Sequence, residues 1–124
     1  MSFRLDERLR SFTHAFRGLG WMMRSQHNAW IHAVATVVVI VAGAWTGLAA
    51  WEWCALTLAI GLVWVAEALN TALEFLADEV SREKRELIGK AKDVGSAGVL
   101  LAAICSVIIG LLIFVPHWVR WAVS

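Results

Sequence analysis

The chain has 124 residues, of which 60% are hydrophobic, and it contains eight Trp and no Tyr. Its mean hydropathy of +0.67 and its long apolar runs exclude an ordinary soluble domain and predict an integral membrane protein with one domain, residues 1–124. The net charge is only +1, so nothing indicates a nucleic-acid partner. Cys54 and Cys105 lie within apolar runs and are interpreted as small buried hydrophobes, without disulfide or metal spacing.

Residues 3–20 show an amphipathic helical pattern, with hydrophobic residues recurring every three or four positions and arginines mostly on the other face. We expect this helix to lie in the membrane interface, with its arginines toward anionic headgroups. With its link to the first span, this surface region covers residues 1–29. Packing against the protein's own core is the alternative. No signal-peptide pattern is visible, so we expect the mature chain to begin near Met1.

Three apolar stretches of membrane length follow, at residues 31–50, 54–77 and 94–115. The predicted fold is therefore all-α, with an N-terminal amphipathic interfacial helix and three transmembrane helices. We expect Pro116 to end the last span. Small residues in this span recur at four-residue spacing, which lets another helix approach closely: Gly98, Ala102, Ser106 and Gly110.

The distribution of Lys and Arg predicts the orientation of the spans. The first 30 residues hold five, the charged segment 78–93 holds five, the link between the first two spans holds none and the C-terminal tail holds one. Because positive residues collect on the cytoplasmic side, we expect the N-terminus and a loop at residues 78–93 to be cytoplasmic.

The second span carries a polar face that indicates a functional site. At helical periodicity one face holds Glu67, Asn70, Thr71, Glu74 and Asp78. A charged side chain inside a membrane helix costs a few kcal/mol, roughly 2.5–3.5 or more, to insert. Such a face is therefore typical of a site or of a polar contact that holds an oligomer together.

Other polar residues are expected at the same cytoplasmic end of the spans. They come from the starts of the first and third spans: Gln26, His27, Asn28, His32, Lys92 and Asp93. Carboxylates, Mg²⁺ and a lysine are what a phosphoryl-transfer site needs. The chain has neither GxxxxGK[ST] nor GxGxxG, so any ATP site must be of another type.

The segments EALNTALEFLADEV and GKAKDVGSAGVLLAA, together with SFTHAFRG and QHNAWIH near the N-terminus, resemble the prokaryotic diacylglycerol kinase family, which includes undecaprenol kinases. The resemblance covers nearly the whole chain. It implies a small three-span homotrimeric enzyme of the bacterial inner (plasma) membrane that transfers the γ-phosphate of ATP to a lipid hydroxyl. The AKDVGSA stretch favours diacylglycerol as substrate, giving phosphatidic acid, whereas N-x-x-I-H is closer to the undecaprenol kinases.

The resemblance also implies roles for individual residues. Glu67 matches the general base that takes the proton of the lipid hydroxyl, and Asn70 would hydrogen-bond nearby and hold the site. Glu74 matches a carboxylate that binds Mg²⁺ with ATP. Lys92 and Asp93 match residues that contact the nucleotide.

Three further positions correspond less closely to the family pattern. His14 and Arg85 occupy places of nucleotide contacts. Gln26 stands where the family commonly has its second metal-binding carboxylate, and its carbonyl oxygen would bind Mg²⁺ without charge.

The alternative function is a non-enzymatic membrane protein whose carboxylates conduct protons or hold an oligomer together. The pair Lys92–Asp93 favours the kinase, because a proton path needs no such pair at the membrane surface. Taken alone, the pair would be interpreted as an interfacial ion pair capping a helix. His27, His32 and His117 are predicted to be satisfied interface histidines.

Overall fold

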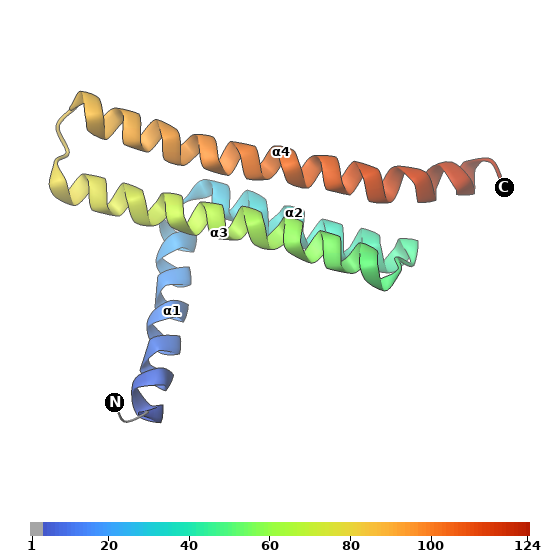
Figure 1. The fold of residues 1–124 in the computed structure, drawn as a ribbon, viewed down its shortest axis with the longest axis horizontal. Helices are drawn as coiled ribbons and strands as arrows, with labels where there is room; N and C mark the ends of the chain where they lie inside the picture. The colour runs from blue at the N-terminus through green and yellow to red at the C-terminus, as the bar shows by residue number, and fades with distance from the viewer. Residues whose placement is uncertain (1–3) are drawn as a thin grey trace.

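The computed structural model describes residues 4–124, which form four helices (Figure 1): α1 (Leu5–Ser25), α2 (His27–Thr46), α3 (Ala50–Val80) and α4 (Glu86–Ala122). No strand occurs within residues 4–124, so the all-α prediction is confirmed. Phe3, the first residue of the expected amphipathic pattern, lies outside the described residues.

Helices α2, α3 and α4 are each long and apolar enough to cross a membrane, as the sequence predicted. At 1.5 Å per residue, the 31 residues of α3 and the 37 of α4 span about 46 Å and 55 Å. Both lengths exceed the hydrocarbon core of a bilayer, which is about 30 Å thick. The two helices therefore extend beyond that core, and their charged segments lie at the end where α3 joins α4.

The expected loop at residues 78–93 is mostly helical, and the link between α3 and α4 covers only residues 81–85. Pro116 does not end the last helix, which continues to Ala122. Two contacts hold the segment after the proline in place. His117 Nε2 lies 2.9 Å from a carboxylate oxygen of Glu52, and Trp118 Nε1 donates to Thr46 Oγ1 at 3.1 Å. Transmembrane helices tolerate proline where such neighbours support the helix.

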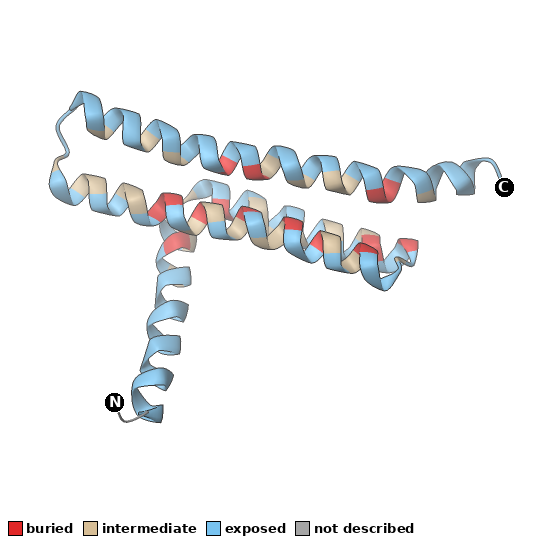
Figure 2. Cartoon of the chain, in the orientation of Figure 1, coloured by how far each residue is buried: buried red, intermediate tan, exposed pale blue. Residues whose placement is uncertain are grey.

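Apart from Met22 of α1, the buried residues lie where α2, α3 and α4 face one another (Figure 2). Leu56 packs with Ile113 and Phe114, and Ser106 Oγ donates to the carbonyl of Ala59 at 2.9 Å. In the most apolar window of each helix, only 17–33% of the residues are buried. The remaining apolar surface must therefore face lipid or another chain.

Helix α1 stands at a steep angle to the other three helices (Figure 1). Its apolar stripe does not pack against the chain's own core: the exposed hydrophobic residues are Leu5, Leu9, Phe12, Phe16 and Leu19. Only Met22, near its end, is buried. The core-packing alternative therefore fails for most of the helix, and an interfacial position stays the prediction.

Candidate functional site

The polar face of α3 runs from a buried end to a partly exposed end. Glu67 is completely buried, Asn70 and Thr71 are also buried, and Glu74 and Asp78 are half-buried. The helical repeat aligns these residues over about three turns. The environment of the polar face therefore changes from buried to partly exposed along α3.

Glu67 faces His32 of α2, with Nε2 of the imidazole 3.3 Å from Oε2 of the carboxylate. The two groups are at ion-pair distance but are not aligned as a hydrogen bond. Both oxygens of Glu67, Nε2 of His32 and Oδ1 of Asn70 are buried without a hydrogen-bond partner within residues 4–124. Buried polar atoms are nearly always paired, so these unpaired atoms make the cluster a candidate site.

His32 is held in place by neighbours on both sides. Its carbonyl accepts a 2.7 Å hydrogen bond from Thr36 Oγ1, which in turn accepts one of 3.0 Å from Trp64 Nε1. The His32 and Trp64 rings meet edge to face, with centroids 6.4 Å apart. The prediction of a satisfied interface histidine is nevertheless wrong for His32, because its buried Nε2 has no hydrogen-bond partner within residues 4–124. Its place in QHNAWIH, beside the polar residues that start this span, was the available signal.

Asn70 lies against the backbone of α4 at Gly95. A Cβ atom on Gly95 would come within 2.5 Å of Asn70 Oδ1 and 2.8 Å of Leu73 Cδ2. Only a glycine therefore lets the amide and the α4 backbone meet at this distance. The sequence pattern predicted a close approach along Gly98, Ala102, Ser106 and Gly110. Ala102 is buried and Ser106 Oγ reaches the Ala59 carbonyl of α3, but a Cβ on Gly98 or Gly110 meets nothing within 4 Å in the described chain.

Gln26 and Glu74 lie together, as the proposed metal site requires. Gln26 is the single residue between α1 and α2, and its extended backbone breaks the helix there. From this break its Nε2 donates a 2.6 Å hydrogen bond to Glu74 Oε2.

The pair offers only a few oxygen ligands for a metal. No group of three His, Cys, Asp or Glu residues able to hold a metal occurs in the described part of the chain. Mg²⁺ usually takes one or two protein carboxylates and completes its shell with water and substrate phosphates. Glu74 supplies one carboxylate for that mode of binding. Gln26 presents its amide N–H to Glu74, so the amide must turn over before its oxygen can reach the same metal.

Lys92 pairs with Asp78 across the α3–α4 junction, with Nζ 2.6 Å from Oδ1. Its partner is therefore not the neighbouring Asp93, which is exposed. Arg85 is exposed at the start of α4, and His14 is exposed on α1. Within residues 4–124, no hydrogen bond or ion pair joins Arg85 or His14 to the α3 face.

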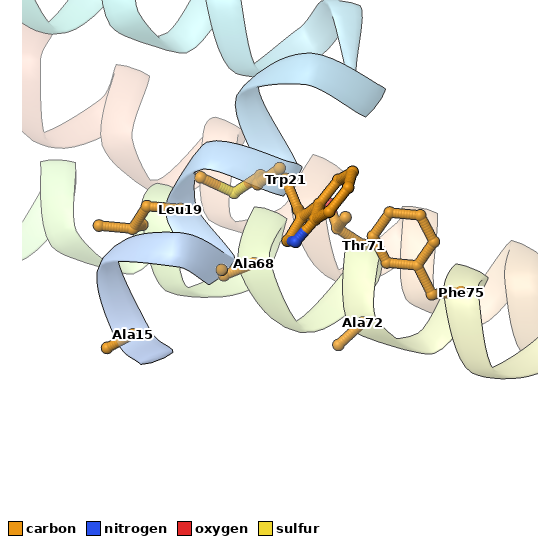
Figure 3. A pocket seen from close by; sticks show the side chains of 9 residues that line it. Ala15, Leu19, Trp21, Ala68, Thr71, Ala72 and Phe75 are labelled. Atoms are coloured by element: carbon orange, nitrogen blue, oxygen red, sulfur yellow. The ribbon is translucent and has the colours of Figure 1, made fainter. Parts of the chain in front are cut away.

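Three hollows border the polar face. One of about 540 Å³ lies between α1 and α3, and Figure 3 shows its lining side chains, among them Trp21, Thr71 and Phe75. A second, of about 270 Å³, is lined by residues of α2, α3 and α4: Asn28, Ile31, His32, Asn70, Ser96, Val99, Leu100 and Ala103. A third, of about 610 Å³, lies between α3 and α4 and includes Gly95. The buried polar atoms are therefore close to space that a ligand or water can enter.

A separate polar cluster closes the opposite end of the helices. Glu52 is 5% exposed, accepts a hydrogen bond from the Ala49 N–H at 3.0 Å, and lies 2.9–3.0 Å from His117 Nε2. The prediction that His117 is a satisfied histidine is confirmed. The distance along α3 from Glu52 to Glu67, about 22 Å at 1.5 Å per residue, separates this cluster from the candidate site.

Comparison with known proteins gives one consistent result. The family model described as prokaryotic diacylglycerol kinase matches residues 13–114. The chain is 38% identical over 112 residues to an undecaprenol kinase of Bacillus subtilis (strain 168), covering 90% of this chain and 91% of that protein. It is 32% identical over 114 residues to a diacylglycerol kinase of Escherichia coli (strain K12), covering 86% and 93%. It is 39% identical over 107 residues to a diacylglycerol kinase of Synechocystis sp., covering 86% and 61%.

Proposed function

Because the chain belongs to the prokaryotic diacylglycerol kinase family and is therefore a membrane-bound lipid kinase, we propose that it phosphorylates diacylglycerol with ATP and that Glu67 is the general base. Membership of this family removes the non-enzymatic alternative. The observation that carries the role of Glu67 is its burial with both carboxylate oxygens unpaired in the described chain.

In the proposed reaction, Glu67 takes the proton of the lipid hydroxyl as the hydroxyl oxygen attacks the γ-phosphorus of ATP. The bond from that phosphorus to the bridging oxygen breaks, and ADP leaves. Asn70, one turn away on the same face of α3, holds the site by hydrogen bonding near the attacking group, and its buried Oδ1 has no partner among residues 4–124. Phosphoryl transfer depends mainly on positioning and charge, so a rigid helix face that carries both groups suits it.

We assign Mg²⁺ to Glu74 and Gln26, and we assign nucleotide contacts to Lys92, Asp93, Arg85 and His14. When bound, the metal neutralises charge on the phosphate oxygens. The contacts Gln26–Glu74 and Lys92–Asp78 support this assignment, because both bring separate helices together along the partly exposed end of the α3 face. Glu74 lies about two helical turns from the buried Glu67, so the proposed metal and the proposed general base share one face of α3.

Undecaprenol is the second candidate substrate. Support for it comes from the 38% identity to the undecaprenol kinase, whereas two of the diacylglycerol kinases are 32% and 39% identical. Both lipids present a primary hydroxyl at the interface. A radiolabelled ATP assay in mixed micelles that offers both lipids in equal amounts decides between them. We expect label mainly in phosphatidic acid, and label mainly in undecaprenyl phosphate would assign the second substrate.

We further propose that the enzyme is a homotrimer whose N-terminus and α3–α4 junction are cytoplasmic. The largely exposed apolar faces of α2 to α4 and the Lys/Arg distribution support these two points. Crosslinking of active protein in vesicles is expected to give trimers. Recovery of monomers alone at full activity would refute the trimer.

A further inference from the structure

We propose that His32 is a positioning residue that acts through Glu67. Its imidazole orients the carboxylate and receives, at Nε2, the proton that Glu67 has taken from the lipid hydroxyl. This inference rests on the proposed role of Glu67 as the general base. The sequence pattern predicted no role for His32. The observation that supports one is the 3.3 Å distance between its Nε2 and Glu67 Oε2, two buried atoms without a hydrogen-bond partner within residues 4–124.

The proton balance explains why a second group is useful. Transfer forms the bond between the lipid oxygen and phosphorus, breaks the bond to ADP, and leaves one proton on Glu67. A completely buried carboxyl group has no water beside it to remove that proton before the next turnover. A neutral imidazole at 3.3 Å accepts it, so the carboxylate regains its negative charge.

His32 also provides a way out for the proton. Its side chain is 16% exposed and lines the hollow of about 270 Å³ that also contains Asn28, Asn70 and Ser96. These polar groups make the hollow suitable for water, which needs several hydrogen-bond partners. Asn28 is exposed, so the hollow leads from the buried imidazole toward the surface. The proton therefore passes from Glu67 to His32 and then to solvent.

The groups around the imidazole are suited to this role. Helix α3 presents Glu67 and, edge to face, the ring of Trp64. A second hollow at His32, of about 350 Å³, lies deeper between α2, α3 and α4. Helix α4 lines both hollows only with residues that do not ionise in the physiological range: Ser96, Val99, Leu100, Ala103, Ser106, Val107, Gly110, Leu111, Phe114, Val115 and Trp118. Thr36 Oγ1 accepts a hydrogen bond from the indole N–H of Trp64 and donates one to the backbone carbonyl of His32. In the described chain the imidazole thus has one ionisable neighbour, Glu67.

The test compares His32→Gln with His27→Gln, an exposed histidine at the start of the same helix. Both variants are assayed for kcat, for KM of lipid and ATP, and for the pH dependence of kcat. We expect His32→Gln to lower kcat at least about tenfold, less than the roughly 10²–10⁴-fold typical of losing a general base, with both KM values unchanged. The pH dependence of kcat in His32→Gln is expected to differ from that of the wild type, because the variant has no imidazole to accept the proton from Glu67. His27→Gln matches the wild type.

Two further measurements separate the possible failures. If Glu67→Gln retains activity, the proposed function of Glu67 fails and this inference fails with it. If Glu67→Gln is inactive while His32→Gln keeps the wild-type kcat and pH profile, only the role of His32 is overturned. Nitrogen NMR of ring-labelled histidine tests the contact without a His32 variant, which covers the case that His32→Gln does not fold. The His32 Nε2 signal is expected to shift in Glu67→Gln, and an unchanged signal contradicts the proposal.

Discussion

Gln26 and Glu74 are 48 positions apart in the chain, yet Gln26 Nε2 donates a 2.6 Å hydrogen bond to Glu74 Oε2. We predict that Gln26→Glu lowers the Mg²⁺ concentration needed for half-maximal activity, because a second carboxylate adds charge to the proposed site. Gln26→Leu removes the oxygen and is expected to raise that concentration. Titration of activity with Mg²⁺ measures both effects, with His27→Leu as the control. The assignment of Gln26 as a metal ligand fails if both Gln26 variants require the same Mg²⁺ concentration as the wild type.

Gly95→Ala is expected to lower both stability and activity. The added methyl group would lie 2.5 Å from Asn70 Oδ1 and 2.8 Å from Leu73 Cδ2, so α4 must move or Asn70 must turn away. Overpacking of this kind costs about 1–3 kcal/mol. Gly98→Ala, one turn later on α4, meets nothing within 4 Å in the described chain and is the matched control. Thermal unfolding in detergent and kcat are measured for both, and equal behaviour would show that the close approach is not needed.

Lys92 and Asp78 form an ion pair that has two possible roles. Lys92 binds the nucleotide, or the pair stabilises the packing of α4 against α3. If Lys92 contacts ATP, Lys92→Gln raises KM for ATP about tenfold, equivalent to about 1.4 kcal/mol. Asp78→Asn leaves the lysine charge available and is expected to change KM for ATP much less. Steady-state kinetics at varied ATP distinguish the two. An equal rise of KM for ATP in both variants would instead show that the pair stabilises the packing of α3 against α4.

The fold was largely predictable because membrane thickness fixes the length of a spanning helix and hydropathy reveals that length. The polar face of α3 was predictable for a similar reason, since the 3.6-residue repeat alone aligns Glu67, Asn70 and Glu74. The ends of the helices were less predictable. Charged residues after Asp78 favoured a loop in the sequence pattern, but both helices continue past the apolar region and leave a link of residues 81–85.

Contacts between helices were not predictable from periodicity, because they depend on how each helix is rotated about its axis. The approach of His32 on α2 to Glu67 on α3 accompanies a second contact between the same helices, the hydrogen bond from Trp64 to Thr36. Likewise, a four-residue ladder identifies a small-residue face but not which glycine the neighbouring side chains crowd, which is Gly95. The sequence showed the residue types of the site and left their partners undetermined.

His117→Ala is expected to lower the melting temperature of the protein. The substitution leaves the buried carboxylate of Glu52 without its partner at 2.9–3.0 Å and frees the segment of α4 that follows Pro116. His27→Ala, at an exposed position, is expected to melt like the wild type. Circular dichroism during heating in detergent measures the difference. An unchanged melting temperature for His117→Ala would show that the contact contributes nothing to stability.

The most direct test of the central assignment compares wild type with Glu67→Gln in the radiolabelled ATP assay with diacylglycerol and undecaprenol. Glutamine keeps the size of the side chain but cannot take a proton, so we expect a loss of roughly 10²–10⁴-fold in kcat. Stabilisation by Mg²⁺ and ATP on heating should be retained, which shows that the variant is folded and binds nucleotide. Transfer to either lipid at the wild-type rate by Glu67→Gln would contradict the assignment of Glu67 as the general base.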